Sequence, residues 1–128
     1  MFDALVVDDE EDIGEILKEE LEELGLVTIA VATGEAALKL TEMNEWKLCL
    51  VDLKLATSVT GLDVIRAIRE RRPKALVIAM TGYVDVSLRQ ETEKLGVAAY
   101  FAKPDDLRPE VFRRKIKAVL DPLERGKK

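Results

Sequence analysis

Four apolar runs of this chain each lead directly into residues whose side chains can do chemistry. These residues are Asp8 and Asp9 after residues 4–7, Asp52 after residues 48–51, Thr81 after residues 75–80, and Lys103 after residues 98–102. Clustered carboxylates repel one another unless a proton or a cation neutralises them. A site made of oxygen ligands suits Mg²⁺, which takes a few protein carboxylates together with substrate phosphate. The combination indicates an aspartate that accepts a phosphoryl group, with Asp52 as the nucleophile.

The other members of this group have separate predicted roles. We expect Asp9 and Asp52 to bind Mg²⁺ directly and Asp8 to act through water. Lys103 is the second cation that stabilises the phosphoryl charge. Two further donors to the phosphoryl oxygens are predicted, the hydroxyl of Thr81 and the backbone amide of Gly82.

Each residue taken alone also has an ordinary structural interpretation. Asp8 or Asp9 could cap the helix that follows. Asp52 could begin a loop, and Thr81 with the following glycine could form a turn. What favours the chemical interpretation is the joint order of an acidic pair, an aspartate, a threonine and a lysine, each placed directly after an apolar run.

The elements that must position these residues alternate along the chain. Buried strands are predicted at residues 4–7, 27–31, 48–52, 75–80 and 98–102, and helices at residues 13–24, 35–43, 61–72, 85–95 and 107–120. Turn and cap signals support these bounds: Thr33 as an N-cap, a capping box from Thr60 to Asp63, and Gly25 and Gly96 at helix ends. This alternation predicts the α/β class, a doubly wound parallel sheet of five strands with five helices on its two faces.

Length, charge and composition narrow the class of protein. The 128 residues predict one domain at residues 1–121 and a short basic tail at 122–128, of which the last five residues are expected to fray. A net charge of −5 argues against direct nucleic-acid binding, and the absence of histidine excludes histidine-based catalysis and histidine-ligated metal sites. The lone Cys49, within an apolar run, fits a core thiol in a reducing cytoplasm. No leader is recognised, and no apolar run approaches the ~20 residues of a membrane span.

Five short motifs together resemble the response regulator receiver domain, the phospho-acceptor module of two-component signalling. They are Val6-Val7-Asp8-Asp9-Glu10, Asp52-Leu53, Gly61-Leu62, Met80-Thr81-Gly82 and Tyr100-Phe101-Ala102-Lys103-Pro104. The resemblance runs from about Phe2 to Leu120. It implies the flavodoxin-like strand order 2-1-3-4-5, in which the first and third strands are neighbours and their acids converge.

The resemblance also implies partners and further roles. A sensor histidine kinase or phosphotransfer protein would phosphorylate Asp52 in the presence of Mg²⁺, and the backbone carbonyl of Lys54 would be a ligand of that ion. Leu53 would join the phosphoryl-binding residues, and Thr81 and Tyr100 would act as the switch. The bond between Lys103 and the following proline is expected to be cis. A downstream effector protein or a missing output domain would read the switch, and the resemblance also implies phosphorylation-dependent homodimers through the fourth and fifth helices.

The chain departs from the usual receiver pattern at three places. Ala56 stands where relatives usually carry proline, and the loop reaches Gly61 one residue late, so a different loop shape is expected. Asp105-Asp106 replaces the usual apolar residue after the Lys-Pro pair, which predicts a different start of the last helix. Cationic Lys54 and bulky Tyr83 occupy positions that tune phosphoaspartate lifetime in relatives, and we expect them to lengthen it.

Two other functions compete with the signalling switch. One is a phosphorylation-independent interaction module, which the complete set of acids, threonine and lysine disfavours. The other is an aspartyl-phosphate phosphohydrolase, but such enzymes usually place a second aspartate just after the nucleophile, where this chain has Leu53-Lys54. The switch is not an enzyme in the usual sense, since it promotes only its own phosphotransfer and dephosphorylation. A stand-alone receiver and a piece of a longer regulator are both compatible with the sequence.

Overall fold

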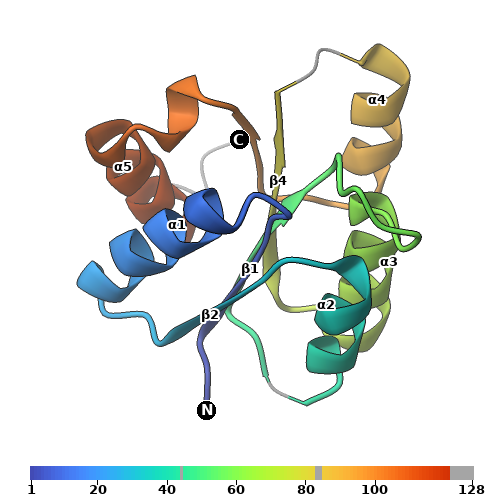
Figure 1. The fold of residues 1–128 in the computed structure, drawn as a ribbon, viewed down its shortest axis with the longest axis horizontal. Helices are drawn as coiled ribbons and strands as arrows, with labels where there is room; N and C mark the ends of the chain where they lie inside the picture. The colour runs from blue at the N-terminus through green and yellow to red at the C-terminus, as the bar shows by residue number, and fades with distance from the viewer. Residues whose placement is uncertain (44, 83–84, 122–128) are drawn as a thin grey trace.

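The computed structural model describes residues 1–43, 45–82 and 85–121, so the predicted tail at 122–128, with its expected fraying, lies outside the described residues. Strands and helices alternate through them (Figure 1). In chain order the elements are β1 (Ala4–Val7), α1 (Glu11–Glu23), β2 (Thr28–Val31), α2 (Gly34–Thr41), β3 (Leu48–Asp52), α3 (Gly61–Arg71), β4 (Leu76–Thr81), α4 (Val86–Lys94), β5 (Ala99–Ala102), the 3₁₀-helix η1 (Asp105–Leu107) and α5 (Pro109–Leu120). None of these helices is long and apolar enough to cross a bilayer.

The strands form one parallel sheet in the order β2-β1-β3-β4-β5. This confirms the predicted doubly wound fold. Val7 of β1 lies opposite Val51 of β3, and Asp52 lies opposite Met80 of β4. Because the strands are parallel and in register, the residues that follow β1, β3 and β4 meet at one edge of the sheet.

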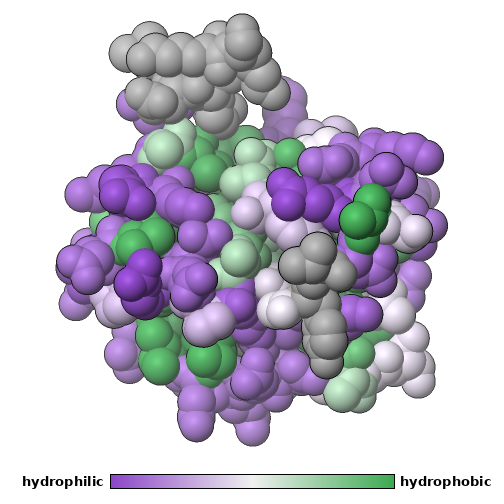
Figure 2. All heavy atoms as spheres, turned by 90° about the horizontal axis from the view of Figure 1, so that it is seen from above, coloured by the Kyte–Doolittle hydropathy of each residue, from purple (hydrophilic) through white to green (hydrophobic). Residues whose placement is uncertain are grey.

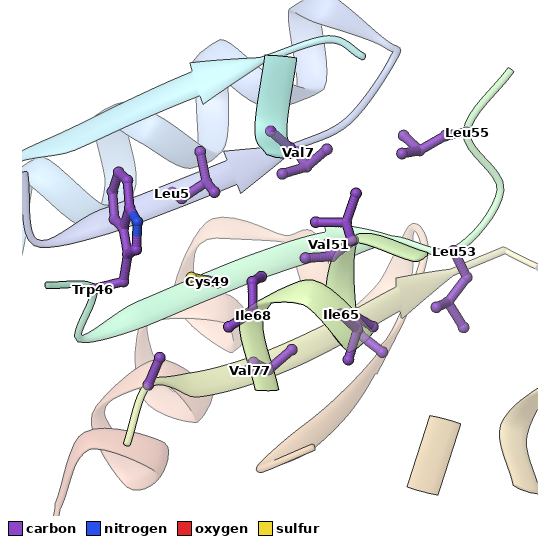
Figure 3. Packing of buried hydrophobic residues seen from close by; sticks show 14 residues of the cluster. Leu5, Val7, Trp46, Cys49, Val51, Leu53, Leu55, Ile65, Ile68 and Val77 are labelled. Atoms are coloured by element: carbon purple, nitrogen blue, oxygen red, sulfur yellow. The ribbon is translucent and has the colours of Figure 1, made fainter. Parts of the chain in front are cut away.

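The sheet separates two layers of helices. α1 and α5 cover one face, and α2, α3 and α4 cover the other (Figure 1). Side chains of β3 alternate between them: Cys49 and Val51 pack with α3 residues such as Ile65, whereas Leu48 and Leu50 pack toward α1 and α5. Figure 3 shows the α3 side, where the strand side chains meet those of the helix. Burial on both faces explains why the strands are continuous apolar runs.

Local signals set the helix ends as predicted. The Oγ1 atom of Thr60 accepts a hydrogen bond from Asp63 N (3.2 Å), and the Asp63 carboxylate accepts one from Thr60 N (2.9 Å), so the capping box is confirmed. Thr33 Oγ1 caps α2 by accepting from Ala36 N (3.1 Å). Gly25 has a φ of 89°, a left-handed conformation that glycine adopts without cost after a helix end.

Two features of the helices differ from what the sequence pattern indicates. Ile16 of α1 stands at helical spacing among apolar residues, yet it is 47% exposed. With 100° of rotation per residue, Ile16 lies at the rim of the stripe centred on buried Leu17. The last helix begins at Pro109 rather than at Leu107, because a 3₁₀ turn precedes it. The predicted change at this helix start is therefore confirmed.

Asp106 holds that 3₁₀ turn in place. Its Oδ2 accepts a hydrogen bond from Ala102 N (2.8 Å) at the end of β5, and its Oδ1 pairs with Lys115 Nζ (2.7 Å) on α5. Burial would raise the pKa of the Asp106 carboxyl, but these two partners outweigh it and lower the pKa. The acid thus connects the strand, the turn and the helix.

Candidate functional site

Asp52 lies at the carboxyl end of the central strand β3 and is 4% exposed. Its Oδ1 accepts a hydrogen bond from Lys54 N (3.0 Å), which is the loop-starting contact that the sequence allowed. Its Oδ2 lies 3.2 Å from Lys103 Nζ. One oxygen therefore fixes the carboxylate while the other faces a cation.

Lys103 brings three carboxylates together. Its Nζ lies 3.0 Å from Asp8 Oδ2 and 3.0 Å from Glu10 Oε1, in addition to the contact with Asp52. The lysine follows β5, and the expected cis bond to Pro104 is present. Burial would lower the pKa of Lys103, but the hydrogen bonds to the two acids and the charge of Asp52 raise it above its ordinary value. The ammonium therefore stays charged at neutral pH.

Asp8, at the end of β1, is buried beside this ammonium. Its Oδ1 accepts a hydrogen bond from Glu10 N (2.9 Å). Burial raises the pKa of Asp8 and the charge of Asp52 adds to the effect, while the bonds from Glu10 N and Lys103 oppose it. A further cation at this position would relieve the crowding of negative charge.

A third acid in the cluster was not predicted from the sequence. Asp8, Glu10 and Asp52 each offer a carboxylate oxygen, and these oxygens lie within 4.8 Å of one another. Oxygen donors at this spacing fit a hard cation such as Mg²⁺ or Ca²⁺. The sequence feature that could have indicated Glu10 as a member of the cluster is its position directly after the acidic pair.

Asp9, the predicted direct ligand, is not among the three described carboxylates that lie within 4.8 Å of one another. Its Oδ2 accepts a hydrogen bond from Ala56 N (2.8 Å) in the loop after β3. Asp9 nevertheless lines the same groove as Asp52 and Lys54. α1 begins at an N-cap, Glu10, that has no side-chain cap bond, so the alternative that Asp8 or Asp9 merely caps this helix is wrong.

The predicted phosphoryl-binding residues surround Asp52 on the β4 side. Thr81 ends β4 and is 4% exposed, and its carbonyl accepts a hydrogen bond from Lys103 N (2.9 Å). Gly82 lines the grooves on both sides of the site. The amide of Leu53 donates to Met80 O (2.9 Å), so β4 already engages it.

Tyr100 lies in β5 and lines a groove of about 650 Å³ together with Thr81. The guanidinium of Arg89 lies over its ring, 4.5 Å from the centroid. Burial raises the pKa of the Tyr100 hydroxyl, and the positive charge of Arg89 opposes this shift. Tyr83, which was expected to affect phosphoaspartate lifetime, lies outside the described residues.

A second, more apolar groove of about 760 Å³ opens beside the acids. Ile13 and Ile16 of α1 line it, as do Pro104 and Leu107 from the segment after β5, and Asp52 also contributes to its lining. Figure 2 looks onto this end of the molecule and shows apolar patches set among hydrophilic side chains.

A known family matches nearly all of this architecture. The model of the response regulator receiver domain covers residues 4–114. The chain belongs to this family. It is a receiver domain of the two-component type, a signalling module.

Curated relatives are identical to this chain at about a third of the aligned residues. The chain is 34% identical over 104 residues to response regulator protein PilR of Pseudomonas aeruginosa, and the match covers 81% of this chain and 23% of PilR. It is 32% identical over 102 residues to the photosynthetic apparatus regulatory protein RegA of Rhodovulum sulfidophilum, covering 80% of this chain and 55% of RegA. Sporulation initiation phosphotransferase F of Bacillus subtilis is 31% identical over 103 residues, which are 80% of this chain and 82% of that protein.

Solved structures share the fold of this receiver. A CheY-like receiver of Methanospirillum hungatei superposes with a TM-score of 0.82 and 30% identity over 89% of both chains. A response regulator of Burkholderia pseudomallei, solved with a phosphorylated aspartic acid, a calcium ion and citrate, has a TM-score of 0.81 and 28% identity. The match covers 95% of this chain and 68% of that one.

Proposed function

We propose that this receiver accepts a phosphoryl group on Asp52 from a sensor histidine kinase or phosphotransfer protein, in a Mg²⁺-dependent reaction. The proposal depends on one observation: Lys103 Nζ bridges Asp8, Glu10 and Asp52 at the carboxyl edge of the sheet. An acidic cluster with a fixed ammonium is complementary to a transferring phosphoryl group and its counterion. A relative that is solved with a phosphorylated aspartic acid and a calcium ion supports the same interpretation.

The acids would hold the cation. Asp8, Glu10 and Asp52 offer the clustered oxygens, Asp9 and Lys54 line the same groove, and the Lys54 carbonyl is a further proposed ligand. A bound Mg²⁺ would neutralise charge on the incoming phosphoryl group. Asp52 keeps its reactive orientation because Lys54 N binds one oxygen and leaves the other toward Lys103.

Lys103 and the end of β4 would receive the phosphoryl oxygens. The raised pKa of Lys103 makes it a permanent positive charge rather than a proton donor. The Thr81 hydroxyl and the Gly82 amide are the proposed donors on the other side. Because Tyr100 shares a groove with Thr81, movement of Thr81 toward the phosphoryl group would change how Tyr100 and Arg89 pack. This couples the modification to a population shift at the surface.

The apolar groove beside Asp52 supports a helical phosphodonor partner. Ile16 is 47% exposed at its rim, and Leu107 also lines it. An amphipathic helix could place its apolar stripe there with the donor next to Asp52. A downstream effector or an output domain would read the changed surface, with a phosphorylation-dependent homodimer as one form of that reading. We place the exchange in the cytoplasm, where the lone buried thiol of Cys49 stays reduced.

Incubation with acetyl phosphate and Mg²⁺, followed by intact-protein mass spectrometry, tests the proposal. One phosphoryl adduct is expected in the wild type, and none in Asp52→Asn or after removal of Mg²⁺ by chelation. Asp12→Asn is the matched control, since this exposed residue of α1 makes the same chemical change away from the cluster. An adduct that survives Asp52→Asn contradicts the assignment. A wild type without any adduct supports the phosphorylation-independent module, and turnover of an unrelated phosphoester supports the phosphohydrolase.

A further inference from the structure

Asp9 is bound by a backbone amide from a distant part of the chain. Its Oδ2 accepts a hydrogen bond from Ala56 N at 2.8 Å, across 47 positions in sequence. The carboxylates of Asp8, Glu10 and Asp52 cluster within 4.8 Å, and Asp9 is outside this group of described residues. The Asp9 carboxylate therefore engages the loop between β3 and α3 through its Oδ2 atom.

The loop that carries this amide is itself held in place. Leu55 is 8% exposed and belongs to the core on the α3 side, as Figure 3 shows. Thr57 Oγ1 donates to Val59 O (2.6 Å) and accepts a long hydrogen bond from Gly34 N (3.4 Å). At Gly34 a Cβ atom would lie 2.4 Å from Val59 O, so the loop and the start of α2 are in direct contact. The Ala56 amide is thus presented to Asp9 by packed neighbours on both sides.

We propose that the Ala56 amide is a positioning group that holds Asp9 in a retracted orientation. In this role, the Asp9 carboxylate turns toward a cation held by Asp8, Glu10 and Asp52 and gives up its bond to Ala56. Cation binding and release of the loop are then coupled. This inference depends on the proposed cation site, and it adds a resting position for Asp9 that links the site to α2.

The sign of the coupling distinguishes this role from preorganisation. If the amide retracts Asp9, removal of the N–H strengthens cation binding, because no bond is lost when Asp9 turns. If the amide presents Asp9 correctly to the cation, removal of the N–H weakens binding. A net contribution of about 1 kcal/mol for such a hydrogen bond corresponds to about a fivefold change in affinity.

Hydrogen exchange of the Ala56 amide in the full wild-type chain gives the first test. With ¹⁵N-labelled protein, we expect exchange with water to accelerate about fivefold when Mg²⁺ saturates the site. The amide of Leu88 in α4 serves as an internal control. It donates to Oδ1 of the N-cap residue Asp85 (3.0 Å), and its exchange rate should not change. An Ala56 amide whose exchange is unchanged or slower with Mg²⁺ overturns the inference.

Mg²⁺ titration by calorimetry gives the second test. Ala56→Pro removes the N–H donor. Ala56→Ser keeps the N–H donor and changes only a side chain that is exposed at this position. The dissociation constant for Mg²⁺ should fall about fivefold in Ala56→Pro and stay unchanged in Ala56→Ser. Equal or weaker binding by a folded Ala56→Pro protein overturns the inference, while Mg²⁺ binding by the wild type still supports the cation site. A wild type that binds no Mg²⁺ overturns both. The exchange measurement decides the matter if proline disrupts the loop.

Discussion

Gly61, the first residue of α3, lies against the backbone that carries the acceptor. A Cβ atom at this position would lie 2.1 Å from Asp52 O and 2.7 Å from Leu53 Cα, both in the main chain. Ordinary van der Waals contact begins at 3.4 Å, so Gly61→Ala must separate the Cβ and the Asp52 carbonyl by a further 1.3 Å (3.4 − 2.1). β3 has hydrogen-bonded neighbours on both sides and cannot yield without disturbing them.

Two effects of Gly61→Ala are expected. Inserting a methyl group into a packed interior costs about 1–3 kcal/mol, and the upper end, about 3 kcal/mol, applies where the neighbours are main-chain atoms. A displacement of about 1 Å at the acceptor also costs roughly 100-fold in rate. Urea unfolding followed by circular dichroism measures the first effect, and the rate of acetyl-phosphate labelling of Asp52 measures the second.

Gly14→Ala provides the matched control. Gly14 is also a buried glycine in a helix, but a Cβ there would lie 3.6 Å from the nearest atom, Ala30 Cβ. This substitution should raise the free energy of unfolding by about 1 kcal/mol through helix propensity and leave labelling unchanged. The reasoning is refuted if Gly61→Ala loses less than about 1 kcal/mol, or if its labelling rate matches that of Gly14→Ala.

Two further predictions concern buried groups. Burial raises the pKa of the Cys49 thiol to about 12. A thiol reagent at neutral pH should therefore label Cys49 of the native protein only as fast as the protein unfolds. Rapid labelling of the native protein would contradict the burial of Cys49 in the core. The lowered pKa of Asp106 means that its ion pair with Lys115 contributes stability above the ordinary carboxyl pKa of about 4 and loses it as pH falls through the folded value. Asp106→Asn should therefore unfold about 1 kcal/mol more easily at pH 7, with a difference from wild type that shrinks toward pH 3; an equal difference at both pH values would exclude the charge as the cause.

The sequence predicted most of the fold because short-range signals agree with the tertiary structure. Apolar runs located all five strands, since β1, β3 and β4 are buried on both faces and the edge strands β2 and β5 are partly buried. Helix ends followed from caps that bind within three residues, as at Thr60. The order of the strands was different: it came from the resemblance, because alternation alone does not choose between doubly wound topologies.

The contacts that the sequence did not predict join segments far apart in the chain. The bond between Asp9 and Ala56 depends on how a loop packs against α2, which no local pattern records. Glu10 joined the cluster because Lys103 reaches it from β5, 93 positions away. The exposure of Ile16 does not follow from its spacing, because a residue at the rim of an apolar stripe has the same periodicity as one at its centre.

The two layers of side chains on either side of the sheet have a consequence for how such a module diversifies. Val77 and Ala79 of β4 pack in the cluster on one face of the sheet, while Ile78 and Met80 pack in the cluster on the other face. The sheet backbone separates the two clusters. Substitutions in separate interiors are expected to combine additively, since they have no common neighbours. Side chains packed under α1 and α5 can therefore change without directly altering the packing under α2, α3 and α4.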